Sequence, residues 1–576
     1  MKITSTSVFS PAPGIESTAP YRTERRLPPI ELYLDGNEGA GTDITAEQWA
    51  GYLDPETLRR YPSAGHLERL LADRHGLDPN RVLVTAGGDE AIDRFCRVAL
   101  SPGRSMILPT PSFAMFPHYA RLMGANLITL PWPEGPYPVD DVLSRVDETV
   151  TAIVLVSPNN PTGAVAAPEA VGRLARSVPA GLILLDLAYA EFAESDLTET
   201  GLEFPNVVVV KSLSKAWGLA GLRVGYALGH PRIIHYLRTA GGPYTVPGLS
   251  LAIAEDRLRN GGADVRSFVN RVKLERQSLR KLLIELGADA LPSDGNFVLA
   301  DFADAEWIRD GLAAMGIAVR LFDDNTELAD KLRITCPGTE ADYASLEHAL
   351  KTVLAPEAVL LDLDGVIADV SRSYRTAIIK TAETFGVTIS HDDISRAKAE
   401  GNANNDWVLT QALLSVRGID AALPEVTGRF EALYHGTDGK PGLRKEECLL
   451  WPVDRLRTLA RRYRLGLVTG RPRKDAELFF DRFGLGDLFS TIVCMEDAPP
   501  KPDPTPIRLA MERLKIRRVW MIGDTPDDCR AARTARALPL GIPAPGDDNP
   551  ETHDSLYRSG AGRILKSLDD LERLLP

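Results

Sequence analysis

Lys215 lies at the centre of a segment rich in glycine and serine, Lys211-Ser-Leu-Ser-Lys-Ala-Trp-Gly-Leu-Ala-Gly-Leu-Arg-Val-Gly225. A lysine that forms a Schiff base must lose its proton and lie beside an electron-withdrawing group. A lone lysine is by default a solvated surface residue, so its neighbours in the sequence decide the interpretation. Asp186 ends an apolar run, and the segments Ser157-Pro-Asn-Asn-Pro-Thr-Gly163 and Gly87-Gly-Asp-Glu90 follow two others. This combination predicts a site that holds a cofactor by an amine, a carboxylate and amides at a helix start.

A second group of chemical residues lies in the last two fifths of the chain. Val359-Leu-Leu-Asp-Leu-Asp-Gly-Val-Ile367 is an apolar run that contains Asp362 and Asp364. Residues two apart at a strand end point the same way, so these carboxylates converge. Such a pair attracts a hard divalent cation, although the short motif alone is as typical of a capped turn.

Three further segments follow in order, and two of them end apolar runs. They are Val468-Thr-Gly-Arg471, Pro499-Pro-Lys-Pro-Asp503 with Lys501 at its centre, and Ile522-Gly-Asp-Thr-Pro-Asp-Asp528. Together with the aspartate pair, these segments predict a site for a divalent cation with a lysine nearby.

Short apolar runs that alternate with amphipathic runs must position both groups. The runs are rich in β-branched residues and bounded by Gly, Pro or Asn, which is typical of buried strands. The expected strands are 81–85, 105–108, 152–157, 181–186 and 206–211, and the expected helices are 89–100 and 169–177. This alternation predicts an α/β fold with a parallel sheet, whose ligand sites lie beyond the carboxyl ends of the strands.

The second unit begins abruptly near residue 356. Residues 342–353 are expected to form a helix, and a strand is expected from residue 358 to 363 after a linker of three residues. A second alternating pattern follows, with strands at 464–468 and 518–522 and a helical insertion at about 371–450. The sequence thus predicts two α/β units, residues 1–356 and 357–576.

Composition excludes several functional classes. The chain has 576 residues, 44% of them hydrophobic and 25% charged, which is typical of a soluble globular protein. A net charge of -13 argues against a nucleic-acid or anionic-membrane partner. Five cysteines without a CxxC pair indicate a reducing cytoplasm, and no apolar run reaches the roughly 18 residues of a membrane span. Residues 1–21, rich in Ser, Thr and Pro, are expected to be a flexible arm and not a signal peptide.

The first group of motifs resembles the fold-type I aminotransferases that use pyridoxal phosphate (PLP), in particular the histidinol-phosphate aminotransferase family, over about residues 30 to 350. The resemblance implies a large domain at about 45–245 and a small domain made of the N-terminal arm and residues 246–356. It implies that Lys215 binds PLP and moves the substrate proton. Asp186 would face the pyridine nitrogen and keep the ring protonated.

The resemblance also assigns the remaining cofactor contacts. Tyr189 and Asn160 would bind the phenolic oxygen, and Phe113 would stack on the ring. The PLP phosphate would be held by the helix start and the residues around the lysine, namely Gly88, Asp89, Glu90, Ser212, Ser214 and Arg223. Tyr61, in Arg60-Tyr-Pro62, resembles a tyrosine that reaches this phosphate from a neighbouring subunit, which implies a homodimer.

Two arginines are candidates for the anionic groups of a substrate. Arg333 resembles the residue that binds the substrate carboxylate, and a planar guanidinium suits that task. Arg320 resembles one that holds a substrate phosphate, and a solvated strand-end arginine is almost as plausible there. In Leu34-Asp-Gly-Asn-Glu38 the pattern departs from the family after Glu38, because Gly39 replaces the usual Asn.

The second group resembles the haloacid-dehalogenase-like hydrolases, over about residues 357 to 576, with the helical insertion as the cap. The resemblance implies that Asp362 attacks phosphorus and that Asp364 protonates the leaving alcohol. Thr469 and Lys501 would hold the phosphoryl oxygens. The expected ligands of Mg²⁺ are Asp362, Asp364, Asp524 and Asp528. In the cap, Asn404, Asn405 and Asp406 could face the site, but an ordinary helix N-cap is the favoured interpretation.

The joint resemblance suggests a bifunctional, cytoplasmic enzyme with small-molecule substrates: transamination of histidinol phosphate, then hydrolysis of its phosphate. Histidinol phosphatases of this hydrolase type are capless and carry a Cys/His zinc loop, which this chain lacks, so the phosphatase substrate stays open. Three alternatives remain: another phosphorylated intermediate, a phosphothreonine-type PLP decarboxylase in the first half, or a second half that only binds a partner.

Overall fold

The fold is described from a computed structural model that covers residues 11, 13–16, 18–20, 28–39, 41, 45–322, 325–401, 405–437 and 440–576. Most of the expected N-terminal arm and Asn404 lie outside these residues. Among the helices in these ranges, none is both long and apolar enough to cross a membrane.

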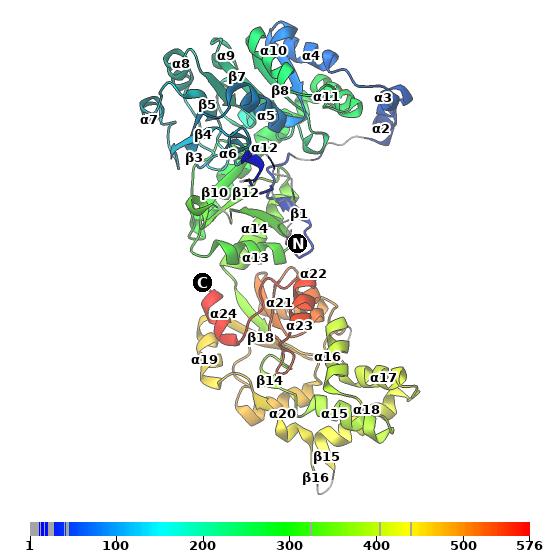
Figure 1. Cartoon of the computed structure of the whole chain (residues 1–576). Helices are drawn as coiled ribbons and strands as arrows, with labels where there is room; N and C mark the ends of the chain where they lie inside the picture. Colours follow the sequence, from blue (N-terminus) through cyan, green and yellow to red (C-terminus); the bar gives the residue numbers. More distant parts are fainter. Residues whose placement is uncertain are drawn as a thin grey trace. The chain divides into compact units, whose positions relative to one another are not determined.

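A seven-stranded sheet carries the first group of motifs (Figure 1). In sheet order its strands are β2 (Val82–Thr85), β8 (Gly225–Gly229), β7 (Val207–Ser212), β6 (Leu182–Asp186), β5 (Val150–Val156), β3 (Ser105–Thr110) and β4 (Asn126–Pro131). The five strands predicted from the sequence are all present, within a few residues at their ends. The sheet is parallel except for β8, which runs antiparallel to both of its neighbours.

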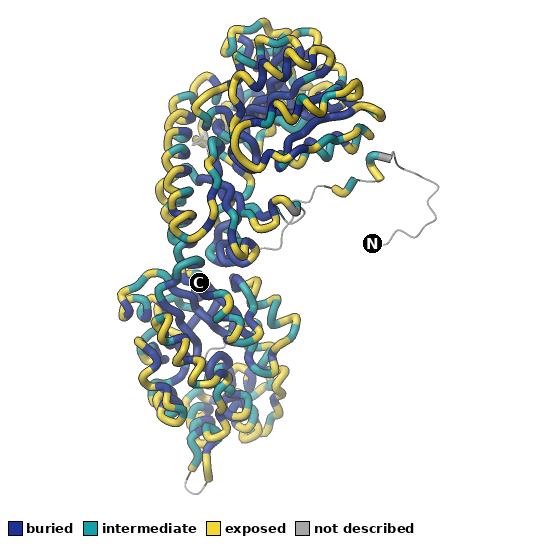
Figure 2. Tube along the Cα trace, turned by 90° about the vertical axis from the view of Figure 1, so that its left-hand side faces the viewer, coloured by how far each residue is buried: buried dark blue, intermediate teal, exposed yellow. Residues whose placement is uncertain are grey.

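The strands of this sheet other than β4 are almost entirely buried because their residues are mostly apolar, and Figure 2 draws buried segments of the chain in dark blue. Helices α5 (Gly87–Ala99) and α10 (Pro231–Ala240) pack against it through Phe95, Ile234 and Leu237. The sheet lacks a polar face, so water-exposed chemistry is confined to the strand ends.

A smaller sheet follows in the order β1-β11-β12-β10-β9. Its strand β10 (Phe297–Asp301) pairs antiparallel with β12 (Lys331–Thr335), which in turn pairs antiparallel with β11 (Ile317–Leu321). The register places Arg320 directly opposite Arg333. Opposite residues of an antiparallel pair share a face, so the two arginines project to the same side.

The second half contains a five-stranded sheet in which every pairing is parallel. In sheet order its strands are β19 (Thr491–Val493), β18 (Arg464–Val468), β13 (Ala358–Leu361), β20 (Val519–Gly523) and β21 (Leu538–Gly541). The central strand β13 precedes Asp362 directly, and β20 precedes Asp524.

Four helices form the predicted insertion after β13. They are α15 (Tyr374–Thr384), α16 (His391–Glu400), α17 (Asp406–Val416) and α18 (Leu423–His435). The chain leaves for them through β14 (Ala368–Asp369) and returns through β17 (Cys448–Leu449), and these two short strands pair antiparallel. The paired strands bring the start and the end of the insertion together beside the site.

The chain divides into two compact units that do not coincide with the predicted boundary at residue 356. One contains residues 34–303 and 319–343, and the other contains residues 304–318 and 344–576, with parts of the N-terminal segment in each. The boundary at residue 356 therefore stays a prediction. Residues 304–318 and the chain from residue 344 up to this boundary precede it in the sequence but belong to the same compact unit as the second sheet.

Trp520 explains this grouping. Its side chain on β20 is fully buried, its Nε1 donates to the carbonyl oxygen of Thr352 at 2.7 Å, and its ring meets that of Trp307 at 5.4 Å between centroids. Thr352 belongs to α14 (Glu340–Leu354) and Trp307 to α13 (Ala305–Ala314). One indole thus joins the central sheet of the second half to two helices that precede it in the sequence.

We expect Trp520→Ala to lower the free energy of unfolding by about 3 to 5 kcal/mol, because it leaves a cavity among buried residues. Trp520→Phe should cost less, since the ring remains and chiefly the bond to Thr352 is lost. Chemical denaturation followed by circular dichroism measures both. A loss of less than about 1 kcal/mol for the alanine variant would contradict this role.

Candidate active sites

The first site lies at the carboxyl ends of β6 and β7. Asp186 is the last residue of β6, and Lys215 follows the end of β7 by three residues. The Lys215 Nζ donates to the carbonyl oxygen of Gly36 at 3.0 Å and lies 5.8 Å from the centre of the Tyr189 ring. Burial raises the pKa of Asp186 to about 7. A buried carboxylate of this kind is stabilised when a cationic group lies against it.

Asn37 links several site residues, although we assigned it no role from the sequence. It is 1% exposed, and its Nδ2 donates to the hydroxyl of Tyr189 at 3.0 Å. Its Oδ1 accepts from the Thr335 hydroxyl at 3.0 Å, and its carbonyl oxygen accepts from Asn296. Its φ of 53° is left-handed, a conformation that asparagine tolerates better than most residues. The asparagine in the entry motif Asp35–Glu38 was therefore the sequence feature that could have indicated a special role for this position.

The start of α5 forms an anion cradle beside Arg223. Gly87 has φ +77°, and a Cβ there would lie 2.6 Å from the Arg223 Nη2. Arg223 donates to Asp89 at 2.8 Å. Glycine thus lets the guanidinium approach the backbone amides at the helix start, which is the arrangement that binds a phosphate.

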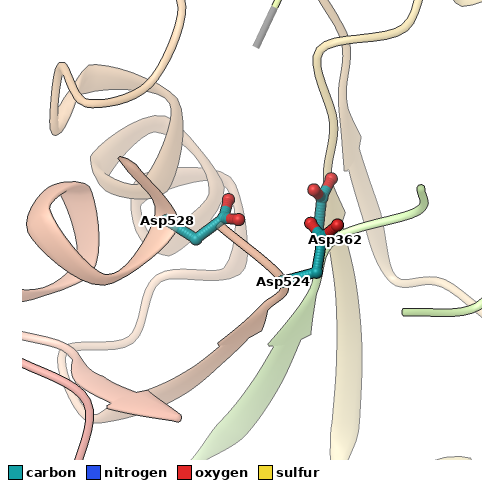
Figure 3. Close-up of side chains that lie close together, drawn as sticks. All are labelled: Asp362, Asp524 and Asp528. Carbon is teal, nitrogen blue, oxygen red and sulfur yellow. The ribbon is translucent and has the colours of Figure 1, made fainter. Parts of the chain in front are cut away.

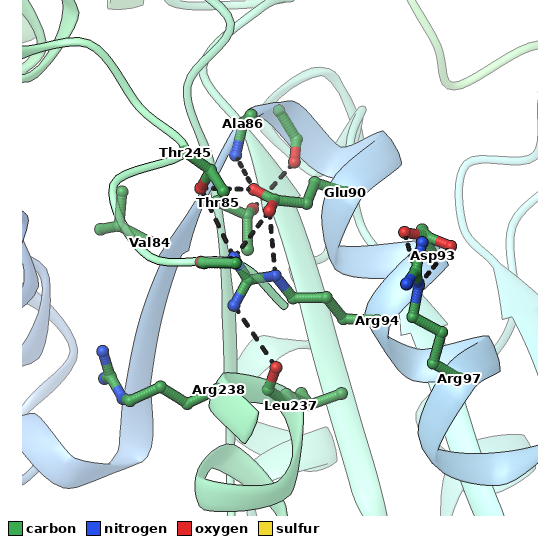
Figure 4. Close-up of polar contacts among 12 residues, drawn as sticks. Val84, Thr85, Ala86, Glu90, Asp93, Arg94, Arg97, Leu237, Arg238 and Thr245 are labelled. Atoms are coloured by element: carbon green, nitrogen blue, oxygen red, sulfur yellow. Dashed lines mark hydrogen bonds and ion pairs between the residues drawn. The ribbon is translucent and has the colours of Figure 1, made fainter. Parts of the chain in front are cut away.

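The Glu90 carboxylate forms hydrogen bonds within the protein (Figure 4), whereas the sequence predicts only that the start of this helix holds the cofactor phosphate. It accepts from the Ala86 amide at 2.5 Å, from Arg94 and from the Thr245 hydroxyl at 2.9 Å. Arg94 is buried and also donates to the carbonyl oxygen of Leu237. The side chain of Glu90 therefore braces the helix start, and only its backbone amide could face an anion.

The two arginines predicted to bind substrate lie next to each other, as the register of β11 and β12 requires. Arg333 is 6% exposed and donates to Asn160 Oδ1 and to the Asp35 carbonyl oxygen. The Arg320 guanidinium lies 5.6 Å from the centre of the Phe322 ring. Asn160 thus joins the predicted carboxylate binder to the cofactor residues.

The remaining predicted residues lie as follows. Ser212 is the last residue of β7, and its hydroxyl accepts from the Ser214 amide at 3.1 Å. Phe113 packs edge-on against Phe116. Tyr61 is 83% exposed and stacks on Tyr244, with 4.9 Å between ring centroids. An exposed tyrosine of this kind is suited to reach another subunit.

Gly39 marks the departure from the family pattern, and the structure gives it a steric reason. A Cβ at this position would overlap the carbonyl oxygen of Lys215. The entry segment therefore passes against the backbone of the lysine, where this chain has room only for glycine.

These residues fit PLP. The buried Asp186 needs a cationic partner such as a pyridinium N–H, the Lys215 amine lies at the same edge of the sheet, and the start of α5 with Arg223 suits a phosphate.

The second site is a cluster of carboxylates at the carboxyl ends of β13 and β20 (Figure 3). Carboxylate oxygens of Asp362, Asp524 and Asp528 all lie within 4.8 Å of one another, and two of the three residues are buried. Burial raises the pKa of Asp362 to about 7 and that of Asp524 well above its usual range, and the neighbouring carboxylates add to both. A hard divalent cation with oxygen ligands would relieve this repulsion, so the cluster fits Mg²⁺.

Lys501 supplies the protein's own cation to this cluster. It is 4% exposed, and its Nζ contacts Asp362 at 3.2 Å and also Asp528. It donates to the carbonyl oxygen of Val468, the residue before Thr469. Burial lowers the pKa of Lys501, but the attraction of the two aspartates outweighs that effect and raises it overall.

The side chain of Asp364 lies in a separate set of contacts. Its Oδ1 accepts from the Arg471 Nε at 2.6 Å, whereas the close set of aspartates consists of Asp362, Asp524 and Asp528. Asp364 as a metal ligand therefore stays a prediction. Arg471, whose side chain is 1% exposed, ends the motif Val468–Arg471, and the sequence assigns it no role.

The cap motif behaves as the helix N-cap that we favoured. Asn405 Oδ1 accepts from the amides of Trp407 and Val408, at the start of α17. Asp406 lies 3.4 Å from the Lys398 Nζ on α16.

Comparisons with known proteins also divide the chain into an aminotransferase part and a hydrolase part. Residues 36–352 match the family described as aminotransferase class I and II, and residues 356–536 match the family described as haloacid dehalogenase-like hydrolase. A histidinol-phosphate aminotransferase of Thermoanaerobacter pseudethanolicus is 37% identical over 338 residues, which cover 58% of this chain and 93% of that protein.

A protein of Phytophthora nicotianae named imidazoleglycerol-phosphate dehydratase is 48% identical over 198 residues, or 33% of this chain. The chain spans only 44% of that protein's length. The solved histidinol-phosphate aminotransferase of Sinorhizobium meliloti in complex with pyridoxal-5'-phosphate aligns with a TM-score of 0.52 and 23% identity, over 60% of this chain and 97% of that one. This similarity concerns the fold.

We expect Lys215→Ala to abolish covalent attachment of PLP, because its Nζ is the amine at the end of β7. Purified protein with added PLP should show an absorbance band that borohydride reduction fixes to the chain. Lys273→Ala is the control, since that lysine binds Glu194 at the surface. A variant of Lys215 that still retains PLP after reduction contradicts the assignment.

Gly365 should be essential to the second site. It has φ +76°, and a Cβ there would overlap the Asp524 carboxylate. Gly365→Ala should therefore lower phosphatase activity at least about 100-fold, since small displacements of catalytic groups are costly.

The matched control is Gly386→Ala, because Gly386 has φ +83° but open space around its Cβ position. It should cost about 1 to 2 kcal/mol of stability and leave the activity near that of the parent chain. Equal activity losses in the two variants would show that strain and not the contact with Asp524 is responsible.

Proposed function

We propose substrates for the two halves of this chain, which belongs to the aminotransferase class I and II family and carries a haloacid dehalogenase-like hydrolase domain after it. The first half would transfer an amino group between glutamate and imidazole-acetol phosphate. The second half would hydrolyse the phosphate of the product, histidinol phosphate. The observation that carries the proposal is a complete set of catalytic groups in each half of one chain.

In the first half, PLP would supply the electron sink for the carbanion at the substrate α-carbon. Asp186 would hold the protonated ring nitrogen, and Tyr189 and Asn160 would bind the phenolic oxygen, where Asn37 already orients the tyrosine hydroxyl. The start of α5, with Arg223 and the serines beside Lys215, would hold the phosphate. Lys215, freed by the substrate amine, would move the proton.

Two adjacent arginines support a site that binds two different anionic groups, the carboxylate of one substrate and the phosphate of the other. Arg333 would bind the carboxylate of glutamate, and Arg320, opposite it on the neighbouring strand, would bind the phosphate of the other substrate. Their shared face lets one site accept both substrates in turn. We further propose a cytoplasmic homodimer, in which the exposed Tyr61 reaches the partner's cofactor.

In the second half, Asp362 is the nucleophile and Asp364 the acid. Asp362 would form a bond to phosphorus while the bond to the leaving oxygen breaks, and the proton of Asp364 would pass to that oxygen. Lys501 and Thr469 would hold the phosphoryl oxygens, and Mg²⁺ bound by Asp362 and Asp524 would offset their charge. Water, deprotonated by Asp364, would then release the phosphate.

Two relatives support the histidine pathway, because they are named as a histidinol-phosphate aminotransferase and an imidazoleglycerol-phosphate dehydratase, enzymes that act on phosphorylated intermediates.

The cap favours keeping a second candidate. Helices α15 to α18 are inserted in the sequence between Asp364 and Arg471, and as a cap they would restrict which phosphate monoester enters. The second half could therefore act on another phosphorylated intermediate while the first half remains an aminotransferase.

One incubation with imidazole-acetol phosphate, glutamate and Mg²⁺ tests the proposal. We expect 2-oxoglutarate, histidinol and free phosphate, and with EDTA we expect histidinol phosphate to accumulate instead. Asp362→Asn should reproduce the effect of EDTA and leave transamination within about threefold of the parent chain, because each half holds its own groups.

Three outcomes separate the possibilities. Transamination of other substrates but never of imidazole-acetol phosphate would refute the histidine-pathway proposal. Release of CO₂ in place of a keto acid would indicate a decarboxylase. A parallel loss of both activities in the Asp362 variant would show that the two sites are coupled.

A further inference from the structure

A buried chain of charges connects the catalytic acid to the end of the cap. Arg471 lies in the loop after β18, and its Nε and Nη2 contact the Asp364 Oδ1 at 2.6 and 2.5 Å. On its other side, its Nη1 donates to the Glu447 Oε2 at 3.2 Å. Glu447 directly precedes β17, the strand by which the chain returns from the cap.

Several side chains hold Arg471 and Glu447 in place. The Arg471 guanidinium lies 4.9 Å from the centre of the Tyr374 ring and 5.2 Å from that of Phe479. Glu447 is 3% exposed, and its Oε1 accepts from the hydroxyls of Ser373 and Tyr434, both at 3.0 Å. A guanidinium between two rings and two carboxylates has little freedom to rotate.

We propose that Arg471 is a positioning residue for Asp364, fixed by Glu447 from the returning cap segment. The inference rests on the proposed phosphatase. Both contacts reach Oδ1, so neither occupies the second oxygen of Asp364, Oδ2, which would be the atom that carries the transferred proton. Glu447 binds the guanidinium on its other side, through Nη1, and so limits its rotation away from Asp364.

The arrangement ties acid catalysis to the cap. Ser373, at the start of the cap, and Tyr434, near the end of α18, both bind the carboxylate that fixes Arg471. The cap segments that choose the substrate therefore also orient the acid that completes its cleavage.

The leaving group provides the test. p-Nitrophenolate leaves without an acid, whereas the alkoxide of glycerol 2-phosphate needs the proton of Asp364. In the full-length chain with Mg²⁺, Arg471→Lys should lower kcat for glycerol 2-phosphate about 100-fold, the usual share of general acid catalysis, and change KM little. The rate of the initial burst of p-nitrophenol from the p-nitrophenyl ester should fall less than about threefold.

A thermodynamic cycle distinguishes positioning from damage to the fold. In an Asp364→Asn background, Arg471→Lys should cause no further loss, because the acid it orients is gone. Arg473→Gln is the control: it removes a partly exposed arginine two residues away that pairs with Asp497, and both esters should react as before. If Arg471→Lys fails to fold, Glu447→Gln tests the same chain, and it should show the same preference for the p-nitrophenyl ester to a smaller degree.

Equal losses for both esters, or an added loss in the Asp364→Asn background, would overturn the positioning role. If the parent chain releases phosphate neither from these esters nor from histidinol phosphate, the proposed phosphatase itself fails and the inference falls with it.

Discussion

Each site is organised around carboxylates that the fold removes from water at the end of a buried strand. Asp186 ends β6, Asp362 follows β13 and Asp524 follows β20, and burial raises the pKa of all three. A charge in such a place is costly unless a cation meets it. In the first site a protonated ring would serve, and in the second Lys501 and a metal ion would. The same constraint thus selects two different chemistries.

Much of the fold follows from local sequence because both sheets consist of short, continuous apolar runs. The predicted strands leading to Asp186, Lys215 and Asp362 are all present, since a strand buried on both faces admits few polar residues. Strands β4 and β8 of the large sheet were not predicted, and β8 is the one that reverses direction beside the lysine loop. It begins at Gly225, the last residue of the lysine motif, whose glycines mask the apolar pattern.

The site residues that escaped prediction act through other residues. Asn37 orients Tyr189, and Arg471 holds Asp364, but neither belongs to a spacing that chemistry alone would single out. Their partners are distant in sequence, so only the folded chain brings them together. Glu90 shows a related limit: the motif predicts that the helix start holds the cofactor phosphate, but it does not predict that the Glu90 carboxylate braces Ala86 and Arg94. A motif fixes where a backbone lies and leaves open what a side chain binds.

The join between the halves follows the same logic of burial. The linker of three residues between α14 and β13 leaves little room for independent packing, and Trp520 uses its indole N–H to satisfy a carbonyl oxygen of α14. An indole buried without such a partner would cost free energy, so the helix end is part of the second core. The two helices α13 and α14 therefore serve the phosphatase fold although the family match assigns them to the aminotransferase. A fusion that shares core residues in this way is harder to separate than one joined by a flexible tether, because cutting at residue 356 would expose Trp520 and Trp307.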